Sequence, residues 1–154
     1  MPLKFPSIYS PLLADVAQLA SWQAEGILEW RPHDRDMAGA LRACHIAVLP
    51  SYREGLPKSL LDAAAMGLPI VASDVPGCRE IARDGENAIL VPLRNAARLA
   101  DAIERLALDP DLRRRMGARG RELVESAFTE ATIVAQTLGL YRAMLAQTAR
   151  RSPD

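Results

Sequence analysis

The chain has 154 residues, which predicts one domain with room for a buried core. Its 19 basic residues balance 19 acidic ones, so no net positive field favours nucleic acid, and the scarcity of aromatic residues argues against a base-stacking surface. The N-terminus shows neither a secretory signal nor an apolar run long enough to span a membrane. We therefore expect a soluble protein without a nucleic-acid partner.

The cysteines and histidines do not form a metal-binding motif. Cys44 and Cys78 stand apart from each other, and neither they nor His33 and His45 show metal-ligand spacing. We expect two buried thiols in a reducing compartment rather than a disulfide. We expect neither a metal ion nor a cofactor.

Hydrophobic patterning predicts strands that alternate with helices up to residue 92, and helices alone beyond it. The expected helices are 11–25, 34–44, 57–66, 78–83, 96–108, 110–126 and 130–147, and the expected strands are 27–30, 46–50, 69–73 and 88–92. The strands lack a polar face, which is typical of a parallel sheet covered by helices on both sides. We expect a single α/β domain over residues 1–154, with a Rossmann-like sheet of about four strands.

Three helix boundaries carry specific signals. Gly67 suits the left-handed stop of the helix expected over 57–66. Asp109 followed by Pro110 suits the cap and first turn of a helix, and Thr129 is a further candidate cap.

The segment that follows the strand at 46–50 combines features of a phosphate site. In an open parallel sheet, ligands bind beyond the carboxyl ends of the strands, where this segment is expected. A glycine lets the backbone approach a ligand, and the free N–H groups of a helix N-terminus suit phosphate oxygens. The residues expected around a diphosphate are therefore Gly55, Leu56, Pro57 and Lys58.

Two acidic residues flank this segment. Glu54 in the loop can reach sugar hydroxyls, and Asp62, about one helical turn in, can accept two hydrogen bonds from a ribose diol. A purely structural interpretation stays open, in which Glu54 favours the helix N-terminus and Asp62 pairs with Lys58 at i, i+4. Such an exposed pair contributes about 0.3–0.5 kcal/mol. The spacing alone does not decide between the two.

The stretch LPSYREGLPKSLLDAAAMGLPIVASDVPGCREIARDGENAILVP resembles the donor-binding half of retaining, GT-B-fold glycosyltransferases of the group 1 family. The resemblance runs from about residue 27 to residue 148 and centres on a pair of acids separated by seven residues, followed by GLPIVAS and PGCREI. It implies that Glu54 binds the donor sugar and that the amides of Gly55 to Lys58 surround the diphosphate. It also implies that Asp62 takes the place of a ribose-binding glutamate.

The chain departs from the family pattern at several points. Asp62 is one methylene shorter than the usual glutamate, and Ala88 replaces the glycine usual after GEN. The resemblance implies that the acceptor-binding half and the first two strands of the donor half, with a basic Arg and Lys pair on their loops, are missing. Lys4 and Lys58 are not convincing replacements. We expect the strand at 27–30 to move beside the strand at 46–50, or a second copy to pair there in a dimer.

The function implied by the resemblance is hexosyl transfer from a nucleotide-sugar, with UDP-sugar favoured, in bacterial surface polysaccharide or lipopolysaccharide synthesis. We expect a cytoplasmic location, with peripheral contact at the inner face of the cytoplasmic membrane as an option. No residue of this chain is expected to be a catalytic base, and the isolated chain is expected to be inactive. The alternatives are a non-catalytic module that completes a separate partner half, and a fragment of a GT-B nucleotide-sugar epimerase. A dinucleotide enzyme is disfavoured because no G-x-G-x-x-G follows a strand.

Three further groups of residues have two interpretations each. Asp74, Gly77 and Arg79 either touch the ligand or only turn the chain. The arginine run from Leu112 to Glu122 is expected to be a solvated helix face, with an anionic membrane as the alternative partner. His33 and Arg35 are candidates for the rim of the site.

Overall fold

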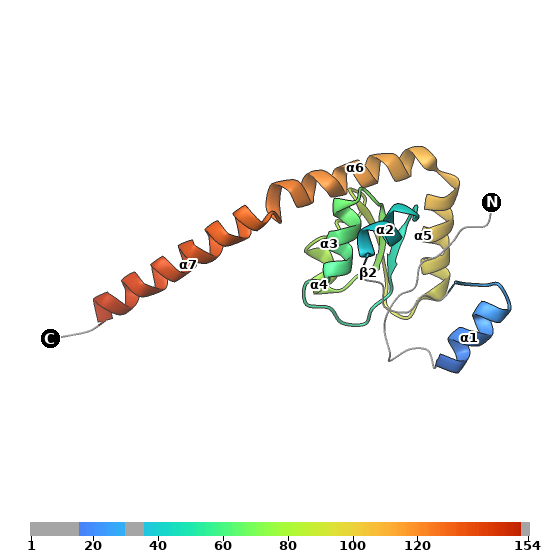
Figure 1. Cartoon of the computed structure of the whole chain (residues 1–154), viewed down its shortest axis with the longest axis horizontal. Helices are drawn as coiled ribbons and strands as arrows, with labels where there is room; N and C mark the ends of the chain where they lie inside the picture. Colours follow the sequence, from blue (N-terminus) through green and yellow to red (C-terminus); the bar gives the residue numbers. More distant parts are fainter. Residues whose placement is uncertain (1–15, 30–35, 152–154) are drawn as a thin grey trace.

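The computed structural model describes residues 16–29 and 36–151, and of residues 148–151 it describes the backbone only. The elements in chain order are α1 (Val16–Ala24), α2 (Met37–Arg42), β1 (Ala47–Leu49), α3 (Lys58–Ala65), β2 (Ile70–Ser73), α4 (Pro76–Arg79), β3 (Ala88–Val91), α5 (Ala96–Leu108), α6 (Pro110–Ala127) and α7 (Glu130–Arg151). Figure 1 shows β2 between helices of the compact body, with α1 below it and α7 extending away.

The three strands form one parallel sheet in the order β1-β2-β3. Val48 is in register with Val71, and Val71 with Ile89. The prediction of an α/β domain with a parallel sheet flanked by helices is confirmed.

The strand expected at 27–30 is absent from residues 27–29, and Trp30 lies outside the described residues. The N–H of Ile27 instead donates to the Trp22 carbonyl at 2.9 Å, and Gly26 adopts a left-handed φ of 73°. These two features close the C-terminus of α1, so the backbone of Ile27 completes a helix instead of a sheet. The described sheet has three strands, and the expectation that residues 27–30 move beside β1 is wrong for residues 27–29.

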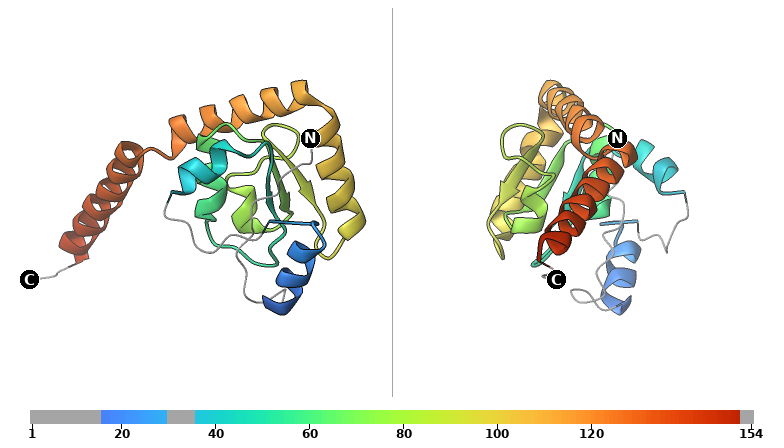
Figure 2. Two further views of the ribbon diagram at one scale, coloured as in Figure 1. Left: turned by 45° about the vertical axis from the view of Figure 1, so that its right-hand side comes forward. Right: turned by 90° about the vertical axis from the view of Figure 1, so that its left-hand side faces the viewer.

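Helices cover both faces of the sheet, as Figure 2 shows. Side chains alternate along β2, so Ile70 and Ala72 pack with Leu60 of α3, whereas Val71 packs with Leu106 of α5. All four residues of β2 are buried. The hydrophobic core therefore lies on both sides of the central strand.

Helix α6 begins where the sequence predicts. The Asp109 carboxylate accepts a hydrogen bond from the N–H of Leu112 at 2.8 Å. Further along, α6 crosses the end of α3 so closely that a Cβ on Gly117 would overlap the carbonyl oxygen of Gly67. Gly67 has the left-handed φ of 71° expected for a helix stop. This crossing fixes α3 against the rest of the body.

Helix α7 leaves the body after Thr129, whose hydroxyl accepts a hydrogen bond from the N–H of Thr132 at 3.2 Å. Large apolar side chains of α7 are exposed: Ile133, Val134, Leu138, Leu140, Tyr141, Met144 and Leu145. Among the described helices, none combines the length and the hydropathy needed to cross a membrane.

Candidate functional site

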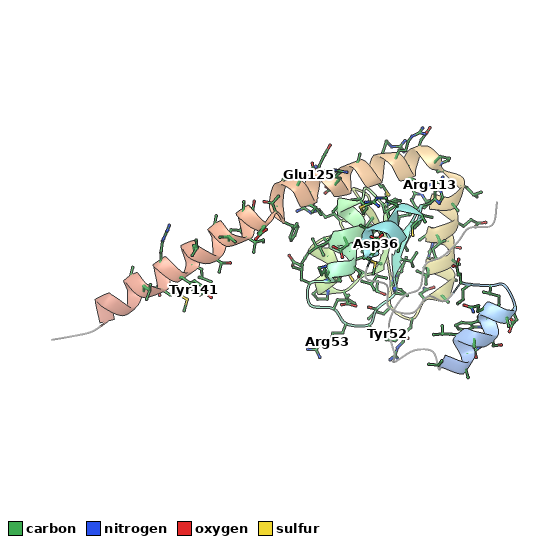
Figure 3. All side chains as sticks on the ribbon, viewed as in Figure 1. Asp36, Tyr52, Arg53, Arg113, Glu125 and Tyr141 are labelled. Atoms are coloured by element: carbon green, nitrogen blue, oxygen red, sulfur yellow. The ribbon has the colours of Figure 1, made fainter. Side chains whose placement is uncertain are left out.

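The candidate site lies at the edge of the sheet where all three parallel strands end. The loop 50–57 leaves β1 there and leads to α3, and the turn at 74–75 leaves β2 for α4. The segment 92–95 leaves β3 at the same edge. Figure 3 shows Tyr52 and Arg53 at this edge, low in the view. The sequence prediction that residues 51–58 occupy the crevice edge agrees with this topology.

The N-terminus of α3 presents uncapped amide groups at this edge. Pro57 is the N-cap residue in extended conformation, and no side chain caps the helix. The N–H groups of Lys58 and Ser59 form no hydrogen bond with another described residue. The sequence analysis includes Pro57 among the residues around the diphosphate. Because Pro57 has no N–H group, its backbone cannot donate a hydrogen bond to a diphosphate. Its role is to fix the entry of the chain into α3.

The backbone of Glu54 and Gly55 rests on Gly77 of α4. A Cβ on residue 77 would overlap the carbonyl oxygens of both loop residues. Gly77 is itself buried. Of the two interpretations that the sequence left open for Gly77, this contact supports a structural one, in which the missing side chain lets the loop lie against α4.

The Glu54 side chain is half-buried and lies close enough to α4 to act on Cys78. Burial and, to a smaller extent, the negative charge of Glu54 together raise the pKa of the Cys78 thiol to about 11. Glu54 forms no ion pair with any described residue. Its carboxylate is therefore available to accept hydrogen bonds from a ligand. Neither Cys78 nor Cys44 forms a disulfide, and both are buried, so the prediction of two buried thiols is confirmed.

Asp62 forms the ion pair that the structural interpretation predicts. Its carboxylate lies 3.5 Å from the Lys58 ammonium, with side-chain exposures of 35% and 88%. The contact directs Asp62 back toward the N-terminus of α3. Because solvent screens such a pair, it contributes only about 0.3–0.5 kcal/mol, and a ligand that hydrogen-bonds Asp62 can replace it.

Asp74 and Arg79 are partners of each other at the end of β2. The Arg79 guanidinium donates to the Asp74 carboxylate at 2.6 Å. This hydrogen bond lowers the pKa of Asp74 and raises that of Arg79. The pair closes the turn from β2 into α4, which again supports the structural interpretation.

One contact at this edge is not predicted by the sequence analysis. The guanidinium carbon of Arg94, after β3, lies 5.5 Å from the centre of the Tyr52 ring, after β1. No local pattern signals this pair, because 42 positions separate the residues and only the parallel sheet brings their segments together.

The arginine run of α6 is mostly exposed, as predicted, but four of its five arginines form hydrogen bonds or ion pairs within the molecule. Arg113 donates to the carbonyl oxygens of Leu106 and Ala107 at 2.5 and 2.8 Å and thereby satisfies the C-terminus of α5. Arg119 pairs with Glu86 and Glu122. The other two pairs of the run are Arg114 with Asp111 and Arg121 with Glu125. His33 and Arg35 lie outside the described residues.

Comparison with known proteins places this chain in a family. The model of the family "Glycosyl transferases group 1" matches residues 24–123. The D-inositol 3-phosphate glycosyltransferase of Streptomyces bingchenggensis is 32% identical over 124 residues, which cover 75% of this chain and 27% of that enzyme. This chain covers a similar share of two other curated relatives, 29% of the length of one and 28% of the length of the other.

Solved structures show the same fold. The sucrose-phosphate synthase of Thermosynechococcus elongatus superposes with a TM-score of 0.78 at 29% identity. The match covers 92% of this chain and 38% of the synthase. The HepE protein of Anabaena, solved in complex with UDP, gives a TM-score of 0.76 at 20% identity over 82% of this chain and 35% of its own. The domain thus has the fold of part of a GT-B glycosyltransferase. The chain belongs to the group 1 glycosyltransferase family.

Proposed function

We propose that this chain is the donor nucleotide-sugar-binding part of a retaining glycosyltransferase. The observation that carries the proposal is the uncapped N-terminus of α3 at the carboxyl edge of the sheet, with Glu54 before it and Asp62 one turn into it. Amide donors and the positive end of a helix dipole suit a diphosphate. Carboxylates on both sides suit the hydroxyls of two sugars.

In this proposal each residue has one role. The amides of Gly55, Leu56 and Lys58 hold the diphosphate, while the Lys58 side chain adds a positive charge. Asp62 releases its ion pair with Lys58 and accepts hydrogen bonds from the ribose diol. Glu54 accepts hydrogen bonds from the donor sugar. Amide dipoles fixed in this way stabilise the leaving diphosphate electrostatically. The acceptor contacts and any general base come from the remainder of the enzyme, since the chain spans only about a quarter to a third of its curated relatives.

We further propose a UDP-sugar as the donor, hexosyl transfer as the reaction, and bacterial surface polysaccharide or lipopolysaccharide as the product. The UDP complex of the Anabaena protein supports the choice of nucleotide. The enzyme would act in the cytoplasm, with peripheral contact at the membrane where a lipid-linked acceptor is used.

Calorimetric titration with UDP, GDP and their glucose conjugates tests the proposal. Glu54→Ala is expected to weaken UDP-glucose about tenfold and UDP little, because Glu54 contacts only the sugar. Asp62→Ala is expected to weaken both ligands about tenfold, because both contain the ribose. Asp101→Ala, which removes an exposed α5 carboxylate 4.0 Å from Arg98, is the matched control. Equal affinities in both site variants and the wild type would remove these residues from the site.

The open edge of β1 supports a separate proposal about assembly. Among the described residues, β1 pairs with β2 on one side only, and its three residues are half-buried whereas those of β2 are buried. Unpaired N–H and C=O groups on an apolar edge strand favour pairing with another strand. We propose that a second copy pairs along this edge. Sedimentation velocity is expected to show a dimer, and a strictly monomeric species would contradict it.

A further inference from the structure

Arg94 lies over an aromatic ring instead of an acid. Its guanidinium carbon is 5.5 Å from the centre of the exposed Tyr52 ring, within the range of a cation–π contact. Because β2 lies between β1 and β3, this contact joins the segments that follow the two outer strands. This contact holds the guanidinium over the segment that leads to Glu54 and α3.

The charge of Arg94 is not compensated by a carboxylate of the described residues. The other basic groups at this edge differ from it. Lys58 is paired with Asp62, and Arg79 with Asp74. Figure 3 shows Arg53 pointing away from the body of the molecule. Arg94 is thus an exposed cation at this edge that contacts Tyr52 and has no ion pair among the described residues.

The backbone of Arg94 supports a role for its side chain. Its φ is 56°, and it is the one non-glycine residue of the described chain with a positive φ. Glycine or asparagine adopts this conformation at lower energetic cost than arginine. The residue directly after Arg94 is Asn95, which caps α5. Residues in such sparsely populated conformations cluster at active sites and ligand-binding segments.

We propose that Arg94, positioned by Tyr52, binds the phosphate oxygens of the diphosphate at the N-terminus of α3. The planar guanidinium donates hydrogen bonds to phosphate in a geometry that lysine cannot reproduce. This inference rests on the proposed donor site. It deepens that proposal by assigning a cation that comes from the end of β3, outside the segment of residues 54–62.

Calorimetric titration with UDP and with inorganic diphosphate tests the inference. Arg94→Gln is expected to weaken both ligands about tenfold to a hundredfold, because a charge-assisted hydrogen bond is lost. Tyr52→Leu is expected to weaken them less, about threefold, because the guanidinium remains but is no longer held. Tyr52→Phe keeps the ring and is expected to bind as the wild type does. Arg98→Gln, on the exposed face of α5, is the matched control.

Arg94→Gly separates binding from folding. Glycine relieves the positive φ, so the urea midpoint is expected to rise while diphosphate affinity falls as in Arg94→Gln. An arginine with a purely structural role would give no loss of affinity in this variant. Wild-type affinity in Arg94→Gln or Arg94→Gly would overturn the inference and leave the Glu54 and Asp62 results to decide the proposed function. Failure of the wild type to bind either ligand at millimolar concentration would overturn both.

Discussion

The loop after β1 and the turn after β2 leave the same edge of the sheet but are held in different ways. In the turn, the Arg79–Asp74 ion pair and hydrogen bonds from the N–H groups of Cys78 and Arg79 to the Val75 carbonyl close a compact unit. In the loop, Glu54 has no ion pair among the described residues. The backbone of Glu54 and Gly55 packs directly against Gly77 of α4.

This difference separates support from ligand binding. The polar groups of the turn form bonds with one another. The loop keeps its carboxylate and amides available, and it needs little internal bonding because Gly77 supports it. Substitution of Gly77 in α4 and of Gly55 in the loop tests this difference.

The largest effect is expected for Gly77→Ala. A methyl group there would collide with the carbonyl oxygens of Glu54 and Gly55, so the loop must move away from α4. We expect a loss of about 1–3 kcal/mol in the free energy of unfolding, as for an overpacked core. We also expect UDP affinity to fall at least tenfold, since both loop residues are displaced. Urea unfolding and calorimetry measure the two effects, and wild-type affinity would show that the loop does not depend on this contact.

Gly55→Ala is the matched substitution in the loop. A Cβ on Gly55 meets no atom of the described residues within 4 Å apart from its chain neighbours, and its φ is not positive. The free energy of unfolding is therefore expected to stay within about 1 kcal/mol of the wild type. UDP affinity is nevertheless expected to fall, because the methyl group occupies the space into which a ligand would approach the backbone. Unchanged affinity would remove Gly55 from the proposed diphosphate site.

Alkaline pH is expected to weaken the support beneath the loop. The pKa of Cys78 is raised to about 11 in the folded protein, from a usual thiol value of 9.0. The unfolded chain therefore loses this proton first, and the free energy of unfolding falls as the pH rises from 9.0 to about 11. Urea midpoints across this range are expected to fall less in Cys78→Ala than in Cys44→Ala, the other buried thiol. Parallel curves for the two variants would contradict the assignment.

The smallest effect is expected for Asp74→Asn. The pKa of Asp74 is lowered by its hydrogen bond from Arg79, so the contribution of the pair is present above the usual carboxyl pKa and lost as the pH falls through the lowered value. Because the pair is exposed, solvent screens it, and the urea midpoint at neutral pH is expected to shift only slightly. A shift as large as that of Gly77→Ala would show that the turn depends on this charge pair.

The elements with strong local signals could be predicted from the sequence. The helix predicted over 96–108 has those bounds in the structure, and Asp109 caps α6 as its position before Pro110 indicates. The β strands of the sheet were recognisable as short apolar runs between turns. Glu54, Asp62 and the N-terminus of α3 could be nominated because the site segment is continuous in sequence.

Features that depend on tertiary contacts could not be predicted. Residues 27–29 have the composition of a strand, but Ile27 closes α1, because no neighbouring strand pairs with this segment in the described sheet. The support of the loop by Gly77 depends on how α4 packs, and a Pro-Gly pair indicates only a turn. The contact between Arg94 and Tyr52 requires the parallel order of the strands.

Helix α7 has a practical consequence for these measurements. Its 22 residues extend about 33 Å at 1.5 Å per residue, and the C-terminal end of the helix lies away from the sheet. A dye or an affinity handle fused at that end would sit on a long arm instead of on the globular body. The protein can thus be tethered to a sensor surface with the carboxyl edge of its sheet left open to solution.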